Sequence, residues 1–222
     1  NYYFYSFAKL AQSKHEEVVF SIPSGNFGDM MGCMLGMSMG LPTKRIIIAT
    51  NANDEFPRMM ETYHYSKIDP SINCISSAMN VGHPSNLSRL IALYGGVMDE
   101  NGAIHIQPDF DRMDSDIYSC SISDELTRAT IKSAWENHKL LLEPHGAVGW
   151  AALEQFIQQY PNLNNPNQLF VSLETAHPAK FPEEINSILA IDPELPESLK
   201  GLEGKPEYVQ ELKKDYNEFK QF

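Results

Sequence analysis

The residues best suited to chemistry follow a short apolar run at residues 17–22. The sequence there reads Pro-Ser-Gly-Asn-Phe-Gly, with Gly25 and Gly28 directly before a predicted Met-rich helix. Glycine lets a backbone approach an anion closely, and a helix N-terminus offers unpaired N–H groups. The pattern matches neither the Gly-x-Gly-x-x-Gly dinucleotide fingerprint nor the Gly-Lys-Ser/Thr of a P-loop. Two interpretations stay open: a small phosphate or carboxylate cradle, and a plain β–α turn.

A second polar group follows the apolar run at residues 169–173. Thr175, His177 and Lys180 come directly after that run, where ligands bind in open α/β sheets. The same residue types are also typical of a capped helix and a solvated lysine. Glu143 and His145, separated by one proline, could form an acid–base pair. Their spacing favours a loop carboxylate and a helix-capping histidine.

The sequence indicates no metal site. Its three cysteines are far apart and form no Cys-x-x-Cys pair, which favours free thiols in a reducing cytoplasm. The aspartates between residues 109 and 116 lack the central glycine and terminal glutamate of an EF-hand, which favours a solvated loop. The methionines between residues 30 and 39 indicate helix packing. Ser24 has no Gly-x-Ser-x-Gly elbow, which argues against a serine hydrolase.

The elements that must position these residues predict an α/β fold, a twisted, mostly parallel sheet flanked by helices. A strand, a helix and a second strand in succession predict a parallel β–α–β unit near the N-terminus. Residues 99–122 show no clear period. The strands are predicted at residues 17–22, 45–51, 73–76, 140–142 and 169–173. The helices are predicted at residues 1–11, 28–39, 54–63, 83–94, 124–138 and 147–160, with another beginning at Phe181-Pro182 and one ending the tail.

Composition excludes several classes of protein. The chain has 222 residues, a formal net charge of −12 and 42% hydrophobic residues. This balance argues against a nucleic-acid surface, an anionic-membrane anchor and a disordered chain. No apolar run approaches the roughly 20 residues of a membrane span. The charge is −6 in residues 99–124, −5 in residues 181–222 and −1 elsewhere, so the candidate site segments are nearly neutral.

Four stretches of the chain together resemble the threonine synthase family. They occur in the family's order, at residues 23–29, 49–58, 143–148 and 175–181. The resemblance implies a pyridoxal-phosphate fold of the tryptophan-synthase-β type. It also implies conversion of O-phosphohomoserine and water to threonine and phosphate. The alternatives are a non-catalytic relative that binds phosphorylated ligands, and another pyridoxal-phosphate-dependent lyase or dehydratase of the same fold.

The resemblance implies roles for individual residues. Residues Gly25, Asn26, Phe27 and Gly28 are expected to hold the cofactor phosphate, and Thr175 to hydrogen-bond the pyridine nitrogen. A neutral hydroxyl there leaves the nitrogen less protonated than an aspartate would, which suits elimination followed by addition of water. His177 and Lys180 receive no role. The candidates for gripping the substrate phosphate are Ser85, Asn86 and Arg89.

The family's Schiff-base lysine lies in a Ser/Thr-Phe-Lys-Asp type of motif that this chain does not contain. We therefore expect that lysine upstream, assign no catalytic residue here, and expect the chain alone to be inactive. Residues 1–190 are expected to be the C-terminal part of the catalytic domain and residues 191–222 an acidic tail. The expected partner is the N-terminal portion of the same protein, against which the aromatic first helix would pack. The whole enzyme is expected to be a cytoplasmic monomer or homodimer.

Overall fold

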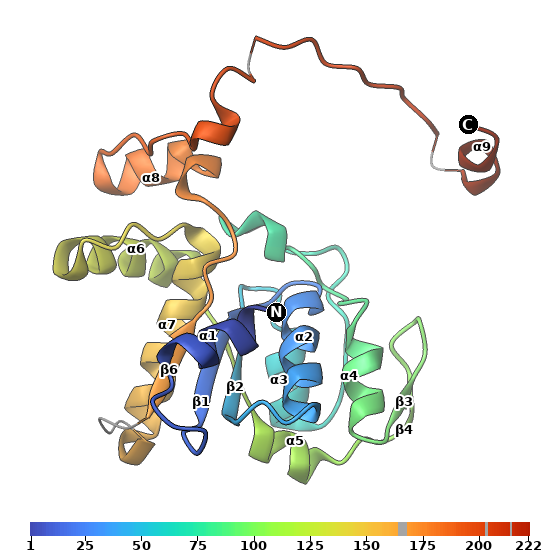
Figure 1. Cartoon of the computed structure of the whole chain (residues 1–222). Coiled ribbons are helices and arrows are strands. Elements are labelled where there is room, and N and C mark those ends of the chain that lie inside the picture. The colour runs from blue at the N-terminus through green and yellow to red at the C-terminus, as the bar shows by residue number, and fades with distance from the viewer. Residues whose placement is uncertain (164–167, 203, 214) are drawn as a thin grey trace.

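The computed structural model describes residues 1–163, 168–202, 204–213 and 215–222, and its centre is a parallel sheet (Figure 1). Four strands lie in the order β5-β2-β1-β6, and every neighbouring pair is parallel. The strands are β1 (Val18–Pro23), β2 (Thr43–Thr50), β5 (Ile117–Ser121) and β6 (Leu169–Ser172). A separate antiparallel ladder joins β3 (Val97–Met98) to β4 (Ile104–Ile106). The predicted α/β fold with a mostly parallel sheet is confirmed.

Strand β1 lies in the middle of the sheet and is buried along its whole length. Phe20 and Ile22 pack into the cluster on one face of the sheet, whereas Val19 packs into the cluster on the other face. The Ser21 hydroxyl, also buried, donates to the Gly149 carbonyl at 2.6 Å. A strand covered on both faces reads as a continuous apolar run, which is why the sequence located β1.

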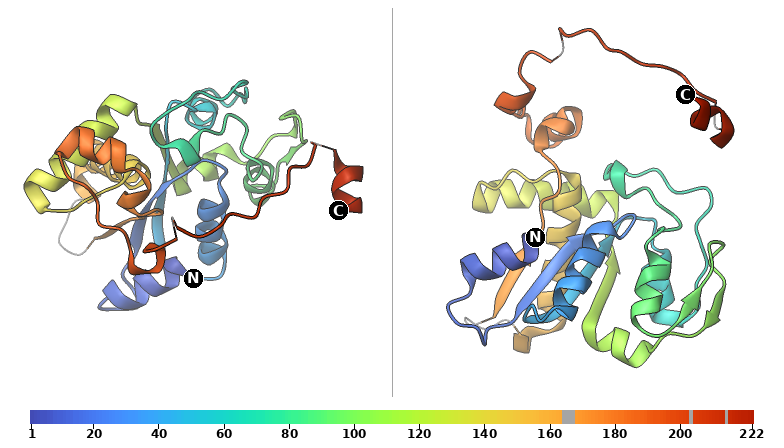
Figure 2. Two further views of the ribbon diagram at one scale, coloured as in Figure 1. Left: turned by 90° about the horizontal axis from the view of Figure 1, so that it is seen from above. Right: turned by 45° about the vertical axis from the view of Figure 1, so that its right-hand side comes forward.

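Helices cover both faces of the sheet (Figures 1 and 2). One face carries α1 (Tyr2–Leu10), α2 (Gly28–Ser38), α3 (Glu55–Thr62), α4 (Leu87–Leu93) and α5 (Phe110–Asp116). The other face carries α7 (Pro144–Gln159), against which α6 (Asp124–His138) and α8 (Pro182–Leu189) pack. In the described part of the chain, no helix is both long and apolar enough to cross a membrane.

The described residues also form four 3-10 helices and a short terminal helix. They are η1 (Ser77–Met79), η2 (Pro161–Leu163), η3 (Pro178–Lys180), η4 (Glu197–Leu199) and α9 (Tyr216–Gln221). Beyond α8 the tail leads away from the sheet, and α9 stands apart from the other elements (Figure 1). The predicted terminal helix is therefore present. The predicted turn at residues 161–167 lies partly outside the described residues.

Two predicted strands are wrong. Residues 73–76 form a loop before η1, because asparagine side chains rather than a neighbouring strand bind their backbone. Residues 140–142 connect α6 to α7. Leu142 is buried in the cluster between α6, α7 and α8 and Leu141 packs against it, whereas Leu140 is exposed, so this apolar run contributes to packing without joining the sheet.

The region without a clear period, residues 99–122, holds structure that the sequence did not reveal. It contains β4, α5 and the edge strand β5. Three of the five residues of β5 are only half-buried and one is exposed, so the strand lacks the apolar run that marked β1. The predicted solvated loop between residues 109 and 116 is mostly α5, with the Asp109 side chain as its N-cap on the Arg112 N–H.

Two predicted helix starts need correction. The helix expected from residue 83 begins at Leu87, because Pro84 and Ser85 belong to the turn that precedes it. The helix expected from residue 147 begins earlier, at Pro144, because Glu143 caps its N-terminus. Asp54 does precede α3, but its carboxylate pairs with Arg58 at 3.0 Å and accepts no capping hydrogen bond.

Candidate active site

The parallel strands bring the ends of β1, β2 and β6 to the same edge of the sheet, and the candidate site lies there. The loop after β1 holds its first candidate residues. Phe27 has a left-handed backbone (φ 63°) and precedes α2, and its buried ring packs on Phe56 with the ring centroids 5.1 Å apart. No acceptor in the described part of the chain faces the N–H groups of Gly28 and Asp29 at the start of α2. This loop can therefore receive an anion.

Gly25 is the position at which another segment approaches the loop most closely. A Cβ atom there would lie 2.8 Å from the Cα of Met79 and 2.9 Å from the Ala78 carbonyl oxygen. Both are backbone atoms, so no side-chain movement would relieve the contact. Helix η1 therefore supports the loop from behind, and glycine is required because the two backbones touch.

The three predicted substrate-phosphate residues contact this loop or each other. The Ser85 N–H donates to Asn26 Oδ1 at 2.6 Å, and Asn86 Nδ2 donates to the Asn26 carbonyl at 2.8 Å. Arg89 donates to Asn86 Oδ1 at 2.7 Å. Both Ser85 and Arg89 are exposed. The structure thus places these three residues beside the loop, and their role in substrate binding stays a prediction.

Thr175 lies on the other side of a cavity of about 750 Å³ that begins at the same loop. The wall of this cavity includes Gly28 and Asp29 of α2, residues 171–175 of β6 and the segment after it, and Tyr2 and Tyr5 of α1. Two motifs far apart in the sequence therefore face one space. None of the described residues that line it is a lysine.

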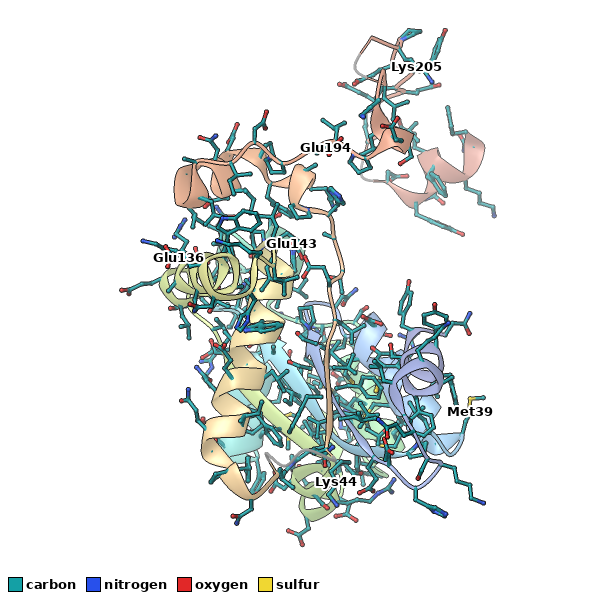
Figure 3. The ribbon with its side chains drawn as sticks, turned by 60° about the vertical axis from the view of Figure 1, so that its left-hand side comes forward. Met39, Lys44, Glu136, Glu143, Glu194 and Lys205 are labelled. Carbon is teal, nitrogen blue, oxygen red and sulfur yellow. The ribbon has the colours of Figure 1, made fainter. Side chains whose placement is uncertain are left out.

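Glu143 and His145 are both buried at the start of α7, where Figure 3 labels Glu143. The carboxylate of Glu143 accepts from the N–H groups of His145 at 2.9 Å and Gly146 at 2.8 Å. It also lies 2.5 Å from Nδ1 of His145. The expectation of a helix-capping histidine is wrong, because the carboxylate caps the helix. His145 Nε2 instead accepts from the Ala78 N–H at 3.1 Å.

Glu174 brings a second carboxylate to the same helix end. Its Oε1 accepts from the Glu143 N–H at 3.1 Å. A Cβ atom at Gly146 would lie only 1.7 Å from Glu174 Oε2, so the carboxylate occupies the space that a side chain there would need. Glu174 is an exposed residue overall, but partial burial of its carboxyl group raises its pKa to about 8; the backbone hydrogen bond lowers it, and the nearby Glu143 raises it further. The sequence reasoning missed Glu174, although its place beside Thr175 was a signal.

His177 and Lys180 lie in and beside the short helix η3, outside the cavity at Thr175. His177 Nδ1 accepts from the Ala179 N–H at 3.1 Å and caps η3, as one of the two interpretations had it. Lys180 is exposed, and its Nζ lies 5.9 Å from the ring centroid of Phe181. Neither residue lines the cavity at Thr175.

Asn51 and Asn53 follow β2 and belong to one of the four family-like stretches. In the structure their side chains hydrogen-bond the segment at residues 72–80. Asn51 Nδ2 donates to Ser76 Oγ and to Asn80 Oδ1, both at 3.0 Å. Asn53 Nδ2 donates to the Ile72 carbonyl at 2.9 Å, and its Oδ1 accepts from the Ile72 N–H at 2.7 Å. These side chains fasten residues 72–80, including η1, to the end of β2.

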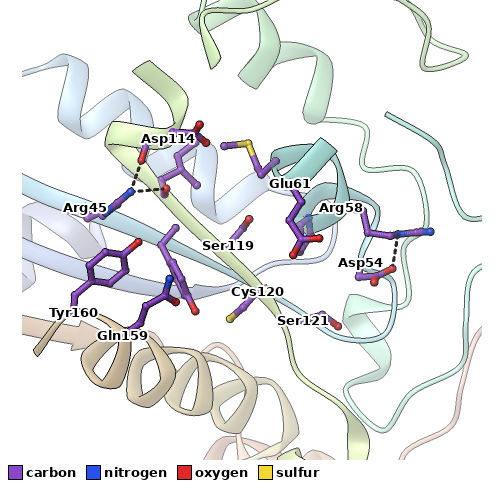
Figure 4. A pocket seen from close by; sticks show the side chains of 14 residues that line it. Arg45, Asp54, Arg58, Glu61, Asp114, Ser119, Cys120, Ser121, Gln159 and Tyr160 are labelled. Atoms are coloured by element: carbon purple, nitrogen blue, oxygen red, sulfur yellow. Dashed lines mark hydrogen bonds and ion pairs between the residues drawn. The ribbon is translucent and has the colours of Figure 1, made fainter. Parts of the chain in front are cut away.

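A different cavity, of about 630 Å³, lies along β5 and contains none of the predicted site residues (Figure 4). Arg45 lies at one end of it, donates to the carbonyls of Asp114 and Ile117, and stacks on the ring of Tyr160. Its guanidinium therefore ties the edge strand to β2. Among the residues that the structure describes, no group of three or more His, Cys, Asp or Glu could hold a metal ion.

Comparisons with known proteins agree with this geometry. A family model described as "Threonine synthase, C-terminal" matches residues 146–222. The threonine synthase of Haemophilus influenzae is 33% identical over the entire chain, which spans 47% of that relative. The pyridoxal-phosphate-bound threonine synthase of Brucella melitensis superimposes with a TM-score of 0.78 at 29% identity, covering 93% of this chain and 45% of that one. The Escherichia coli threonine synthase structure gives 0.71 at 34% identity, covering 89% and 41%. The chain thus spans about half the length of the curated relatives it matches.

Proposed function

Because this chain corresponds to the C-terminal portion of the threonine synthases, we propose that it forms that portion of a pyridoxal-phosphate enzyme that converts O-phosphohomoserine and water to threonine and phosphate. The single observation that carries the proposal is the shared cavity of Gly28 and Thr175. A loop that can receive an anion and a neutral hydroxyl that line one cavity suit the phosphate and the ring of the cofactor.

In this proposal the loop Gly25–Gly28 binds the cofactor phosphate. Its fit rests on the free N–H groups at the start of α2 and on the positive end of the helix dipole. The side-chain oxygen of Asn26 accepts from the Ser85 N–H, which ties the loop to the segment before α4. Buried Phe27 holds the left-handed backbone that turns the chain into α2.

Thr175 orients the ring at the other end of the cavity. Pyridoxal phosphate, when bound, supplies an electron sink for proton removal and loss of the phosphate group. A threonine hydroxyl offers the pyridine nitrogen a neutral partner, so it positions the ring without placing a negative charge beside it. Thr175 is exposed toward the cavity and has room for such a contact.

Ser85, Asn86 and Arg89 are proposed to bind the substrate phosphate. Their support is the direct contact of Ser85 and Asn86 with the cofactor loop and the exposed guanidinium of Arg89 held on Asn86. A guanidinium and a hydroxyl are typical phosphate partners. Binding there would hold the leaving group beside the cofactor.

The rest of the proposed enzyme supplies what this chain does not. No lysine lines the described cavity, so we propose that the lysine that carries the cofactor comes from the N-terminal portion of the protein, the partner of this chain in a monomer or homodimer. The exposed aromatic side chains of Tyr2 and Tyr5 at the cavity wall suit contact with that portion. We also propose a cytoplasmic location, to which the free thiols of the three cysteines are suited.

A titration of the full-length protein with pyridoxal phosphate tests the proposal. The wild type should develop the absorbance band of bound cofactor and release phosphate from O-phosphohomoserine. Thr175→Ala should shift that band and lower kcat, whereas Thr175→Ser, which keeps the hydroxyl, should resemble the wild type. Cofactor binding without phosphate release from this substrate would favour a different lyase. Absence of cofactor binding would leave only a phosphate-binding relative.

A further inference from the structure

The buried imidazole of His145 makes a polar connection between α7 and η1, which also share a hydrophobic cluster through Met79 and Val148. It is 3% exposed and bridges the start of α7 to η1. Its Nε2 accepts from the Ala78 N–H, so the ring proton must be on Nδ1. Nδ1 in turn faces Glu143 Oε2 at 2.5 Å and donates to it. The carboxylate thereby selects the tautomer that can hold Ala78.

Ala78 is in direct contact with the anion-binding loop. The Ala78 carbonyl oxygen and the Met79 Cα are the atoms that leave no room for a Cβ at Gly25. A displacement of η1 therefore removes the support of the loop at the point where its backbone is most closely packed. The hydrogen bond from Ala78 to His145 fixes η1 to the long helix α7.

The anchor at the α7 end is rigid. The Glu143 carboxylate is fully buried and held by two backbone N–H groups of α7. The ring of Phe181 packs on His145 with centroids 5.1 Å apart. The Glu143 N–H also binds Glu174, the residue next to Thr175. Both sides of the cavity are thus fastened to one helix end.

We propose that His145 is a positioning residue: through its Nδ1–H tautomer it holds η1 against Gly25 and so sets the shape of the anion-binding loop relative to Thr175. The inference deepens the proposed function and rests on it, since the anion in question is the cofactor phosphate. His145 touches neither cofactor nor substrate in this role. It acts through Ala78.

Two substitutions separate the two hydrogen bonds of the ring. In His145→Asn the amide reaches the place of Nδ1 and can still donate to Glu143, but it ends short of Ala78. In His145→Gln the longer side chain reaches the place of Nε2, where its carbonyl oxygen can accept from the Ala78 N–H. The matched control is His138→Asn, an exposed histidine at the end of neighbouring α6.

The experiment measures hydrogen exchange of residues 76–80 without ligand, and the dissociation constant for pyridoxal phosphate, in the full-length protein. For His145→Asn we expect faster exchange at Ala78, unchanged exchange in α6, and cofactor binding weaker by about three- to tenfold, the scale of one hydrogen bond. His145→Gln should return both values toward the wild type. His138→Asn should change neither.

Wild-type exchange and affinity in His145→Asn would overturn the inference, and so would equal impairment in both His145 variants. If His145→Asn does not fold, the ¹⁵N shifts of the wild-type imidazole decide. An acceptor Nε2 supports the tie to Ala78, and a protonated Nε2 overturns it. A wild type that does not bind pyridoxal phosphate contradicts the proposed function instead, while the exchange at Ala78 still reports on the role of His145.

Discussion

Two glutamates, Glu143 at the start of α7 and Glu174 beside it, differ in the number of hydrogen bonds that their carboxyl groups accept. Glu143 accepts from two backbone N–H groups and from the imidazole of His145, so its buried carboxylate is fully provided with donors. Glu174 accepts one hydrogen bond, from the Glu143 N–H, and lies close to the Glu143 carboxylate. Its raised pKa, about 8, follows from burial with few donors, with the neighbouring Glu143 adding to the effect.

This difference predicts a pH dependence that Glu174→Gln should remove. The unfolded chain releases the Glu174 proton near its usual pKa of 4.5, whereas the folded chain keeps it until about 8. The group therefore stabilises the fold fully below pH 4.5, and that contribution is lost as the pH rises through 8. Urea unfolding between these pH values should show a shallower decline for Glu174→Gln than for the wild type. Parallel curves would contradict the assignment, and Glu136→Gln, at an exposed position on α6, is the control.

At the scale of elements, the asparagine side chains after β2 replace strand pairing. Residues 73–76 are predicted as a short strand, yet the side chains of Asn51 and Asn80 bind their backbone, and they form a loop that leads into η1. Asn53 binds the backbone of Ile72 just before them. Asn51 is buried, with its amide nitrogen donating to Ser76 and Asn80 and its oxygen accepting from Asn53. This arrangement brings η1 to the position where it supports Gly25.

Replacing Asn51 should therefore loosen a whole segment. Asn51→Ala leaves buried partners without their hydrogen bonds, and we expect it to lower the free energy of unfolding by about 1–3 kcal/mol. Hydrogen exchange should accelerate in residues 72–80 more than in α6 or α7. The control is Asn137→Ala, at an exposed asparagine whose amide donates to Ser133 within one helix. Equal effects of the two substitutions would show that Asn51 has no special role.

At the scale of the whole molecule, the chain combines a four-stranded parallel sheet with an open cavity at Thr175. Its strands, flanking helices and cores on both faces are those of an α/β unit. The cavity at Thr175, however, is walled by the edge strand β6 and by exposed tyrosines of α1. The negative charge is concentrated in residues 99–124 and 181–222, and the remaining residues together carry a formal charge of only −1.

If the lysine that carries the cofactor lies in the N-terminal portion of the protein, as proposed, this chain expressed alone should be inactive. The 222 residues expressed alone should release no phosphate from O-phosphohomoserine, because the proposed loop and Thr175 bind and orient but no lining lysine can carry the cofactor. The full-length protein should be active in the same phosphate-release assay. Turnover by the chain alone would place the missing function within it, with Lys180 and Lys9 as the residues to replace first.

The sequence by itself determined the elements whose pattern is local. β1 is a continuous apolar run because both its faces are covered, and Gly25 marks the loop because only glycine permits its close contact with the backbone of η1. α6 is recognisable from its Ser123 cap and its spacing. The motifs and their place after strands also predict the loop of residues 25–28 and Thr175 as site residues, and Gly28 and Thr175 line one cavity.

Only the tertiary structure decided what depends on distant partners. β5 is a strand because β2 pairs with it, although its own residues lack a strand pattern. Residues 73–76 are a loop because Asn51 and Asn80 reach them first. His145 binds η1 because Ala78, far away in the sequence, comes within 3.1 Å of its ring. Such contacts arise when separate elements meet, and no local period or spacing records them.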